Sequence, residues 1–194
     1  SWSRARHGPT LSSWCAIRDN EHLFGLPNLN PRDQDKIRIG NATMKFTAEI
    51  IKLCIKQVVP TFLENPAGSM LWLAPPIAKF CADVSQGFHR NFITDFCQHG
   101  ARWRKRTRIS SWNAVDCPGL NVTCCGHGGI CSLSGKFRVV LKGVDPISKQ
   151  LWTHIAQPYP NRFAARAAKL MIDSADNIRN NRLHIMFKTG FGPA

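Results

Sequence analysis

The stretch 61-TFLENPAGSMLW-72 decides the predicted fold, because it joins a short apolar run to a turn. Residues 59–63 are too short and too apolar for a helix, so we predict a buried strand that ends at Glu64. Pro66 and Gly68 then turn the chain. A chain with a formal charge of +14 thus places one carboxylate at the end of a strand, which marks Glu64 as a candidate functional residue.

Helices are predicted on both sides of this strand. Residues 43–58 carry apolar side chains at helical spacing, and Pro60 ends this helix. Ser69 is a suitable N-cap for a second helix, which restarts beyond residues 75–76. The order helix, strand, turn, helix is typical of alternating α/β folds, in which ligands bind outside the carboxyl ends of parallel strands, where Glu64 falls.

The rest of the chain is predicted to form a long loop, three strands and one helix. Residues 1–40 are rich in Pro, Asn, Asp and Arg, which favours a loop with a short helix near Glu21–Leu26. Asn41 or Thr43 then caps the helix that follows. Further strands are predicted at residues 91–97, 106–112 and 136–141, and a last helix at residues 161–177.

The composition favours a polyanionic partner. The 194 residues hold 26 Lys and Arg against 12 Asp and Glu, and such a surplus on one domain is typical of nucleic-acid binding, although it also serves solubility. No apolar run approaches the ~20 residues of a membrane span, and the first residues lack the apolar stretch of a signal peptide. We therefore predict an intracellular protein, nuclear if it is eukaryotic, with no membrane partner.

A cysteine cluster at residues 117–131, CPGLNVTCCGHGGIC, offers soft metal ligands between glycines that permit tight turns. Four ligands of this kind can hold zinc tetrahedrally. The spacing matches no standard zinc ribbon or finger, so two alternatives remain open: reduced structural thiols, or a thiol pair that responds to oxidation. The predicted zinc ligands are Cys117, Cys124, His127 and Cys131.

A cationic run at residues 101–108, ARWRKRTR, supplies candidate nucleic-acid contacts. It packs five cations and one indole into eight residues between two apolar strands. Cations at this density suit phosphate contacts, and a tryptophan can stack on a base. The alternative is a solvated hairpin without a ligand. The predicted contacts are Arg102, Trp103, Lys105 and Arg108.

Glu64 is the candidate for proton chemistry. At a strand end beside a proline, its carboxylate would be directed into a crevice, where a partly buried acid can share a proton with a ring nitrogen. The alternative is a glutamate that caps a helix or forms a salt bridge.

Six segments cover most of the chain and carry a resemblance in the same order: SWSRAR, GLPNLNPRDQDKIRIGN, LENPAGSMLW, DFCQHGARWRKRTRI, CSLSGKFRVVLKG and PYPNRFAARAA. In these segments the chain resembles the DNA cytosine-5 methyltransferase-like proteins of environmental, protist and phage sequences. The resemblance implies a Rossmann-like fold that binds S-adenosylmethionine, and a cysteine nucleophile in a Pro-Cys loop. The opening SWSRAR resembles the segment just downstream of that loop, so the chain is expected to be truncated at its N-terminus, with Ser3, Arg4 and Arg6 near nucleic acid.

The resemblance also implies roles for individual residues. The sequence Glu-Asn-Pro at residues 64–66 resembles the family's Glu-Asn-Val element, whose Glu holds and protonates the flipped cytosine. Glu64 and Asn65 are therefore implied to be catalytic. The cationic run is similar in place to the family's Gln-Arg-rich element, so Arg104 and Arg106 are implied to contact the base or to support the site.

Together these patterns predict an α/β protein with a partial Rossmann-like methyltransferase sheet and a basic, Cys-rich C-terminal extension. The predicted division is residues 1–115, the catalytic part, and residues 116–194, the extension with the C-terminal helix; the alternative is a single domain. The predicted function is a fragment of an S-adenosylmethionine-dependent DNA cytosine-5 methyltransferase, inactive alone because the 194 residues hold no Phe-x-Gly-x-Gly loop and no Pro-Cys. The alternative is a basic, zinc-stabilised nucleic-acid-binding module without catalysis, with DNA as the favoured partner.

Overall fold

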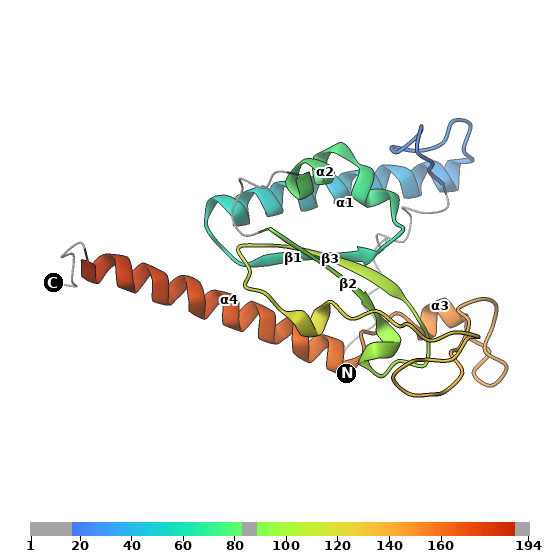
Figure 1. The fold of residues 1–194 in the computed structure, drawn as a ribbon. Helices are drawn as coiled ribbons and strands as arrows, with labels where there is room; N and C mark the ends of the chain where they lie inside the picture. Colours follow the sequence, from blue (N-terminus) through green and yellow to red (C-terminus); the bar gives the residue numbers. More distant parts are fainter. Residues whose placement is uncertain (1–16, 83–88, 189–194) are drawn as a thin grey trace, which may run out of the picture. The chain divides into compact units, whose positions relative to one another are not determined.

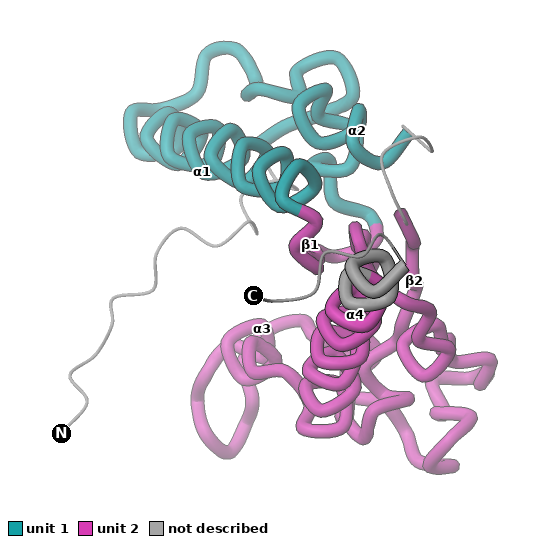
Figure 2. Tube along the Cα trace, turned by 90° about the vertical axis from the view of Figure 1, so that its left-hand side faces the viewer, with its two compact units in different colours: residues 1–57, 68–87 teal, residues 58–67, 88–194 magenta. Residues whose placement is uncertain are grey.

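The structure, a computed structural model, describes residues 17–82 and 89–188. The chain divides into two compact units (Figure 2): unit 1 holds residues 1–57 and 68–87, and unit 2 holds residues 58–67 and 88–194. The chain therefore enters unit 2 for one strand, returns to unit 1, and then stays in unit 2. The division predicted between residues 115 and 116 stays a prediction.

Unit 1 is built on the long helix α1, Pro31–Lys56. It begins well before the predicted start at Thr43, because the side chain of Asn30 accepts a hydrogen bond from the Asp33 N–H and Pro31 occupies the first turn. The predicted N-cap Asn41 lies inside the helix, where its amide donates to the Phe24 carbonyl at 3.0 Å. Both predicted caps are therefore wrong.

Two shorter helices complete the described part of unit 1. They are the 3-10 helix η2, Met70–Leu73, and the helix α2, Pro75–Ala82. Ser69 caps η2 as predicted, since its hydroxyl accepts a hydrogen bond from the Leu71 N–H. The helix predicted near residues 21–26 is absent, because this described segment forms turns.

Unit 2 contains a three-stranded antiparallel sheet in the order β1-β3-β2 (Figure 1). The strands are β1, Thr61–Pro66, β2, Arg90–Asp95, and β3, Arg106–Trp112. The prediction of a mixed α/β protein is confirmed, but the prediction of a Rossmann-like sheet is wrong. A Rossmann sheet needs parallel strands, and the connection at residues 96–105 is too short for the crossover of about a dozen or more residues that joins a parallel pair.

The strand boundaries change the position of Glu64. β1 extends to Pro66, so Glu64 lies inside the strand opposite Ile109 rather than at its end. The strand predicted at residues 106–112 is confirmed as β3, and β2 ends slightly earlier than predicted. The strand predicted at residues 136–141 forms only isolated bridges, from Phe137 and Val139.

The core of unit 2 lies between the sheet and α4, Asn161–Lys188, which runs along one face of the sheet (Figure 1). This helix is longer than the predicted 161–177. The short helices η3, Phe96–His99, η4, Pro118–Leu120, and α3, Trp152–Ile155, lie in the connections. The buried core residues are Phe92, Phe96, Ile109, Ala114, Leu120, Phe163 and Leu170.

No helix in the described ranges has both the length and the apolar content needed to cross a lipid bilayer.

Candidate metal centre and adjoining basic cleft

Three buried cysteines of unit 2 come together as a candidate metal centre. Cys97 lies in η3, directly after β2, whereas Cys124 and Cys131 belong to the loop that follows η4. Their Sγ atoms all lie within 4.8 Å of one another, and each residue is at most 5% exposed. The sequence predicted Cys124 and Cys131, but it gave no signal for Cys97, which reaches the group only through the fold.

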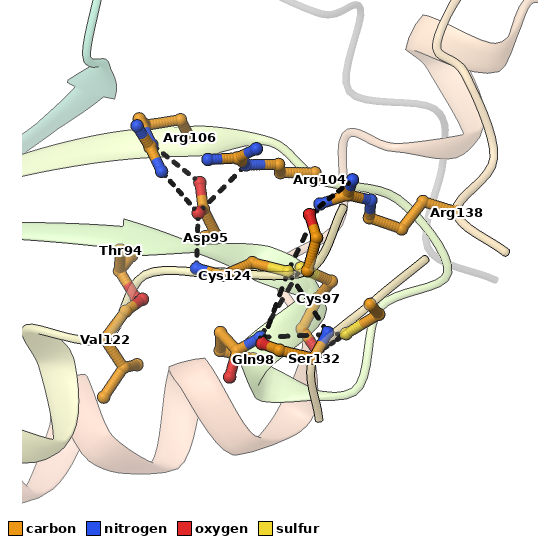
Figure 3. Close-up of polar contacts among 12 residues, drawn as sticks. Thr94, Asp95, Cys97, Gln98, Arg104, Arg106, Val122, Cys124, Ser132 and Arg138 are labelled. Carbon is orange, nitrogen blue, oxygen red and sulfur yellow. Dashed lines mark hydrogen bonds and ion pairs between the residues drawn. The ribbon is translucent and has the colours of Figure 1, made fainter. Parts of the chain in front are cut away.

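A buried carboxylate, Asp95, ties the cysteine loop to the cationic run (Figure 3). It accepts hydrogen bonds from Arg104 Nε at 3.0 Å, from Arg106 Nε and Nη2 at 3.0 and 2.9 Å, and from the Cys124 N–H at 2.7 Å. Burial acts to raise the pKa of Asp95, but the hydrogen bonds from Arg106 and the Cys124 N–H hold it below its ordinary value. Asp95 therefore fixes the start of the cysteine loop as an ion.

Hydrogen-bond donors surround the sulfur of Cys124. Ser132 donates its backbone N–H at 3.4 Å and its hydroxyl at 3.6 Å, and Arg138 donates from Nη1 at 3.2 Å (Figure 3). Burial opposes ionisation of the thiol, but the donors from Ser132 bring the pKa of Cys124 down to about 6. This environment favours the thiolate, which is the form that binds metal.

Cys97 behaves differently from its two neighbours. Burial raises its pKa to about 12, and the adjacent sulfurs of Cys124 and Cys131 add to this effect. Three sulfurs this close repel one another when ionised, and a bound divalent cation removes that repulsion.

The geometry fits zinc or a similar thiophilic ion. A Zn–S bond of about 2.3 Å in a tetrahedral site puts sulfurs about 3.8 Å apart, so the group needs to contract by only about 1 Å. Two predicted ligands stay outside the group: Cys117 precedes η4 and packs against the core cluster, and His127 is absent from the set. Among the described residues, no fourth Cys, His, Asp or Glu joins the three cysteines.

A cleft of about 1070 Å³ adjoins this centre, and Cys97 and Cys131 lie in its wall. Its backbone frame is held by the Val139 N–H, which donates to the Arg102 carbonyl at 2.8 Å and so joins two distant segments. None of the residues that line it is Asp or Glu. The cations and aromatic rings in the wall are Arg102, Lys136, Arg138, Arg162, Trp103, Phe137 and Tyr159.

The predicted nucleic-acid contacts fall into two groups. Arg102 and Trp103 line the cleft, whereas Arg108 donates twice to Asn91 Oδ1 and the Lys105 ammonium lies 5.0 Å from the Phe96 ring centroid. The two arginines that the resemblance marked as catalytic both bind Asp95, as described above. Residues 3, 4 and 6 lie outside the described residues.

Glu64 and Asn65 lie within β1, an edge strand of the sheet, rather than beyond its end. The Tyr159 hydroxyl donates to Glu64 Oε2 at 2.7 Å, while Oε1 is shielded from solvent and has no hydrogen-bond partner in the described part of the chain. Burial, and then the charge of Glu64, raise the pKa of Tyr159. Asn65 is buried opposite Arg108. Their catalytic roles stay predictions.

Comparison of the chain with protein families, with curated proteins and with solved structures finds no match. The resemblance to cytosine-5 methyltransferase-like proteins therefore stays a prediction. Support for a function comes from the cysteine centre and the cleft beside it.

Proposed function

We propose that this chain is a basic nucleic-acid-binding module whose unit 2 is stabilised by zinc. One observation carries the proposal: the three-cysteine centre forms part of the wall of a cleft that is lined by cations and aromatic rings and by no acid. Zinc would hold the loops around the cleft in a fixed conformation, and these loops would position the cations that bind a polyanion.

The loops around the cleft need such an organiser because they bury little apolar surface of their own. Phe137, Val140, Val144 and Ile147 are between 52% and 90% exposed, so this segment has no hydrophobic core to hold it. A structural metal can hold such a segment in place of apolar packing. A zinc ion would join Cys97 in η3 to both ends of the loop from Cys124 to Cys131.

The charge of the chain supports a polyanionic partner. The formal net charge is +14, and four of the cations gather in the cleft wall. Contacts between cations and phosphates release counterions, so binding of this kind weakens steeply with salt. DNA is the partner favoured from the sequence.

The first test is the metal content of the protein purified under reducing conditions. We expect about one zinc per chain, lost in Cys124→Ser and in Cys131→Ser. Cys125→Ser is the matched control, because Cys125 is the adjacent cysteine but is exposed and lies outside the centre. Zinc loss in all three variants alike, or zinc absent from the wild type, would contradict a structural site.

The second test is nucleic-acid binding by fluorescence anisotropy at several salt concentrations. We expect binding that weakens linearly in a plot of log K against log salt. An absence of binding to single strands and duplexes at low salt would contradict the proposed function.

A second candidate is the methyltransferase fragment, active only when an N-terminal segment supplies the nucleophile and the S-adenosylmethionine loop. The observation that favours it is the shielded, unpartnered Oε1 of Glu64, which could accept or share a proton with a base. The antiparallel sheet offers no parallel strand and glycine-rich turn for the cofactor, so S-adenosylmethionine does not fit the described residues. Methyl transfer to cytosine by a longer chain, lost in Glu64→Gln, would support this candidate; equal transfer by both would exclude a role for Glu64.

A further inference from the structure

We propose that the cleft of unit 2 binds single-stranded nucleic acid, with the Phe137 ring as the platform on which an unpaired base stacks. The inference rests on the proposed function and narrows it to one form of nucleic acid.

The exposure of Phe137 is the first observation. The residue is 79% exposed, although it lies in the wall of the cleft between Lys136 and Arg138. A phenylalanine in this position contributes little to folding, because most of its apolar surface stays in water. Proteins that bind single strands place aromatic rings in this way, within a positively charged groove, and stack bases on them.

The backbone under Phe137 is held on both sides, which makes the ring a fixed platform. Phe137 forms a bridge with Ile130, the Cys131 N–H donates to the Lys136 carbonyl at 2.9 Å, and the Arg138 N–H donates to the Gly129 carbonyl at 2.8 Å. The turn therefore begins at a residue of the metal centre. Zinc bound to Cys131 would stiffen the platform further, and a rigid platform loses less entropy when a base stacks on it.

The cations near the cleft form two groups, according to whether their side chains donate hydrogen bonds to other described residues. Arg104, Arg106 and Arg108 donate to Asp95 or Asn91. In contrast, Arg102, Lys136 and Arg162 line the cleft and donate no side-chain hydrogen bond to another described residue. Three cations of the cleft wall are thus not held by hydrogen bonds within the fold, although Arg102 also lies in the field of the Asp145 carboxylate. Phosphates that these cations attract would pass beside Phe137.

The shape and the rings favour a single strand over a duplex. In a duplex the faces of the bases are stacked on one another, so a protein ring can reach a base face only after the base is unpaired. The cleft, at about 1070 Å³, is slightly larger than the usual range for a small-molecule pocket and also carries Trp103 and Tyr159. Trp103 packs against the core cluster and Tyr159 against Phe96 and Phe163, so Phe137 is the most exposed of the three rings.

The test compares single strands of about 12 nucleotides, as DNA and as RNA, with a DNA duplex of the same length. Fluorescence anisotropy at one fixed salt concentration would be measured for the wild type, Phe137→Ala and Phe46→Ala. Phe46 is the matched control, because it is 67% exposed on α1 in the other unit. Unchanged zinc content and thermal unfolding would show that each variant is folded.

We expect the wild type to bind single strands at least tenfold more tightly than the duplex. Phe137→Ala is expected to weaken single-strand binding by about 5- to 150-fold and Phe46→Ala by less than twofold. A preference for DNA or for RNA identifies the natural strand. Equal binding of single strand and duplex, or equal effects of the two variants, would overturn the inference and leave the proposed function standing. No binding to any of the three probes would overturn both.

Discussion

The two ends of one cationic run have different surroundings. Arg104 and Arg106 bind the buried carboxylate of Asp95, whereas Arg102, only two residues before Arg104, lines the cleft and donates no side-chain hydrogen bond to another described residue. The sequence shows five equivalent cations. The structure shows that two of them are held by a buried carboxylate, whereas a third lies in the wall of the cleft.

The largest effect is expected from removing the carboxylate of Asp95, which binds Arg104 and Arg106. Asp95→Ala leaves the cations of Arg104 and Arg106 without their buried partner and the Cys124 N–H without its acceptor. We expect a loss of about 3–5 kcal/mol in the free energy of unfolding, measured by denaturant titration. The control is Asp35→Ala, which removes an exposed ion pair on α1 and should change stability little. Similar losses in both would mean that Asp95 has no special structural role.

Metal removal should have the next largest effect. A chelator under reducing conditions is expected to lower the thermal unfolding temperature, by about 2–4 °C for each kcal/mol of stabilisation lost. Zinc should restore it and magnesium should not, because thiolates bind soft ions. Unfolding that is unaffected by the chelator would indicate that the three cysteines are reduced structural thiols, the alternative left open by the sequence.

A smaller effect is expected at Tyr159, the only tyrosine in the chain. Tyr159→Phe removes the hydrogen bond to Glu64 and should cost about 1–2 kcal/mol. Because the folded state raises the pKa of Tyr159, its contribution is present below the ordinary tyrosine pKa of about 10 and is lost as pH rises above it. The stability difference between wild type and variant should therefore shrink between pH 9 and 11. A difference that stays constant would contradict the shift.

The smallest effects are expected from single cations of the cleft. Lys136→Gln and Arg102→Gln should each reduce the slope of log K against log salt by about 0.7 for a single strand, if each cation neutralises one phosphate. Lys45→Gln changes the net charge equally on the exposed face of α1, and we expect it to leave the slope unchanged. A slope that falls equally in all three variants would show that total charge, not the cleft, governs binding.

The spacing of apolar residues along the chain correctly predicted those helices and strands whose limits depend on neighbouring residues. The limits of β3 follow from its apolar and β-branched residues, and the start of α4 follows from its helical periodicity. The start of α1 was missed because residues 31–42 are largely polar, although Asn30 followed by Pro31 is a recognisable helix start.

The sequence alone could not predict which distant strands and loops lie next to one another. The strand at residues 61–66 has a sequence that suits a parallel and an antiparallel sheet equally, so the predicted Rossmann-like fold rested on the order of elements and on the family resemblance. Cys97 joins Cys124 because the loop after η4 is held against the end of β2, where Asp95 accepts the Cys124 N–H and donates its own N–H to the Val122 carbonyl. Spacing along the chain therefore selected Cys117 and His127 in place of Cys97.

The most direct test of the zinc centre is X-ray absorption at the zinc edge of the purified protein. We predict a shell of three sulfur atoms at about 2.3 Å, reduced in Cys97→Ser and unchanged in Cys117→Ser. The comparison of these two variants separates the centre formed by the fold from the one suggested by spacing. A shell that contains only oxygen and nitrogen, or one that loses sulfur in Cys117→Ser but not in Cys97→Ser, would contradict the zinc centre proposed here.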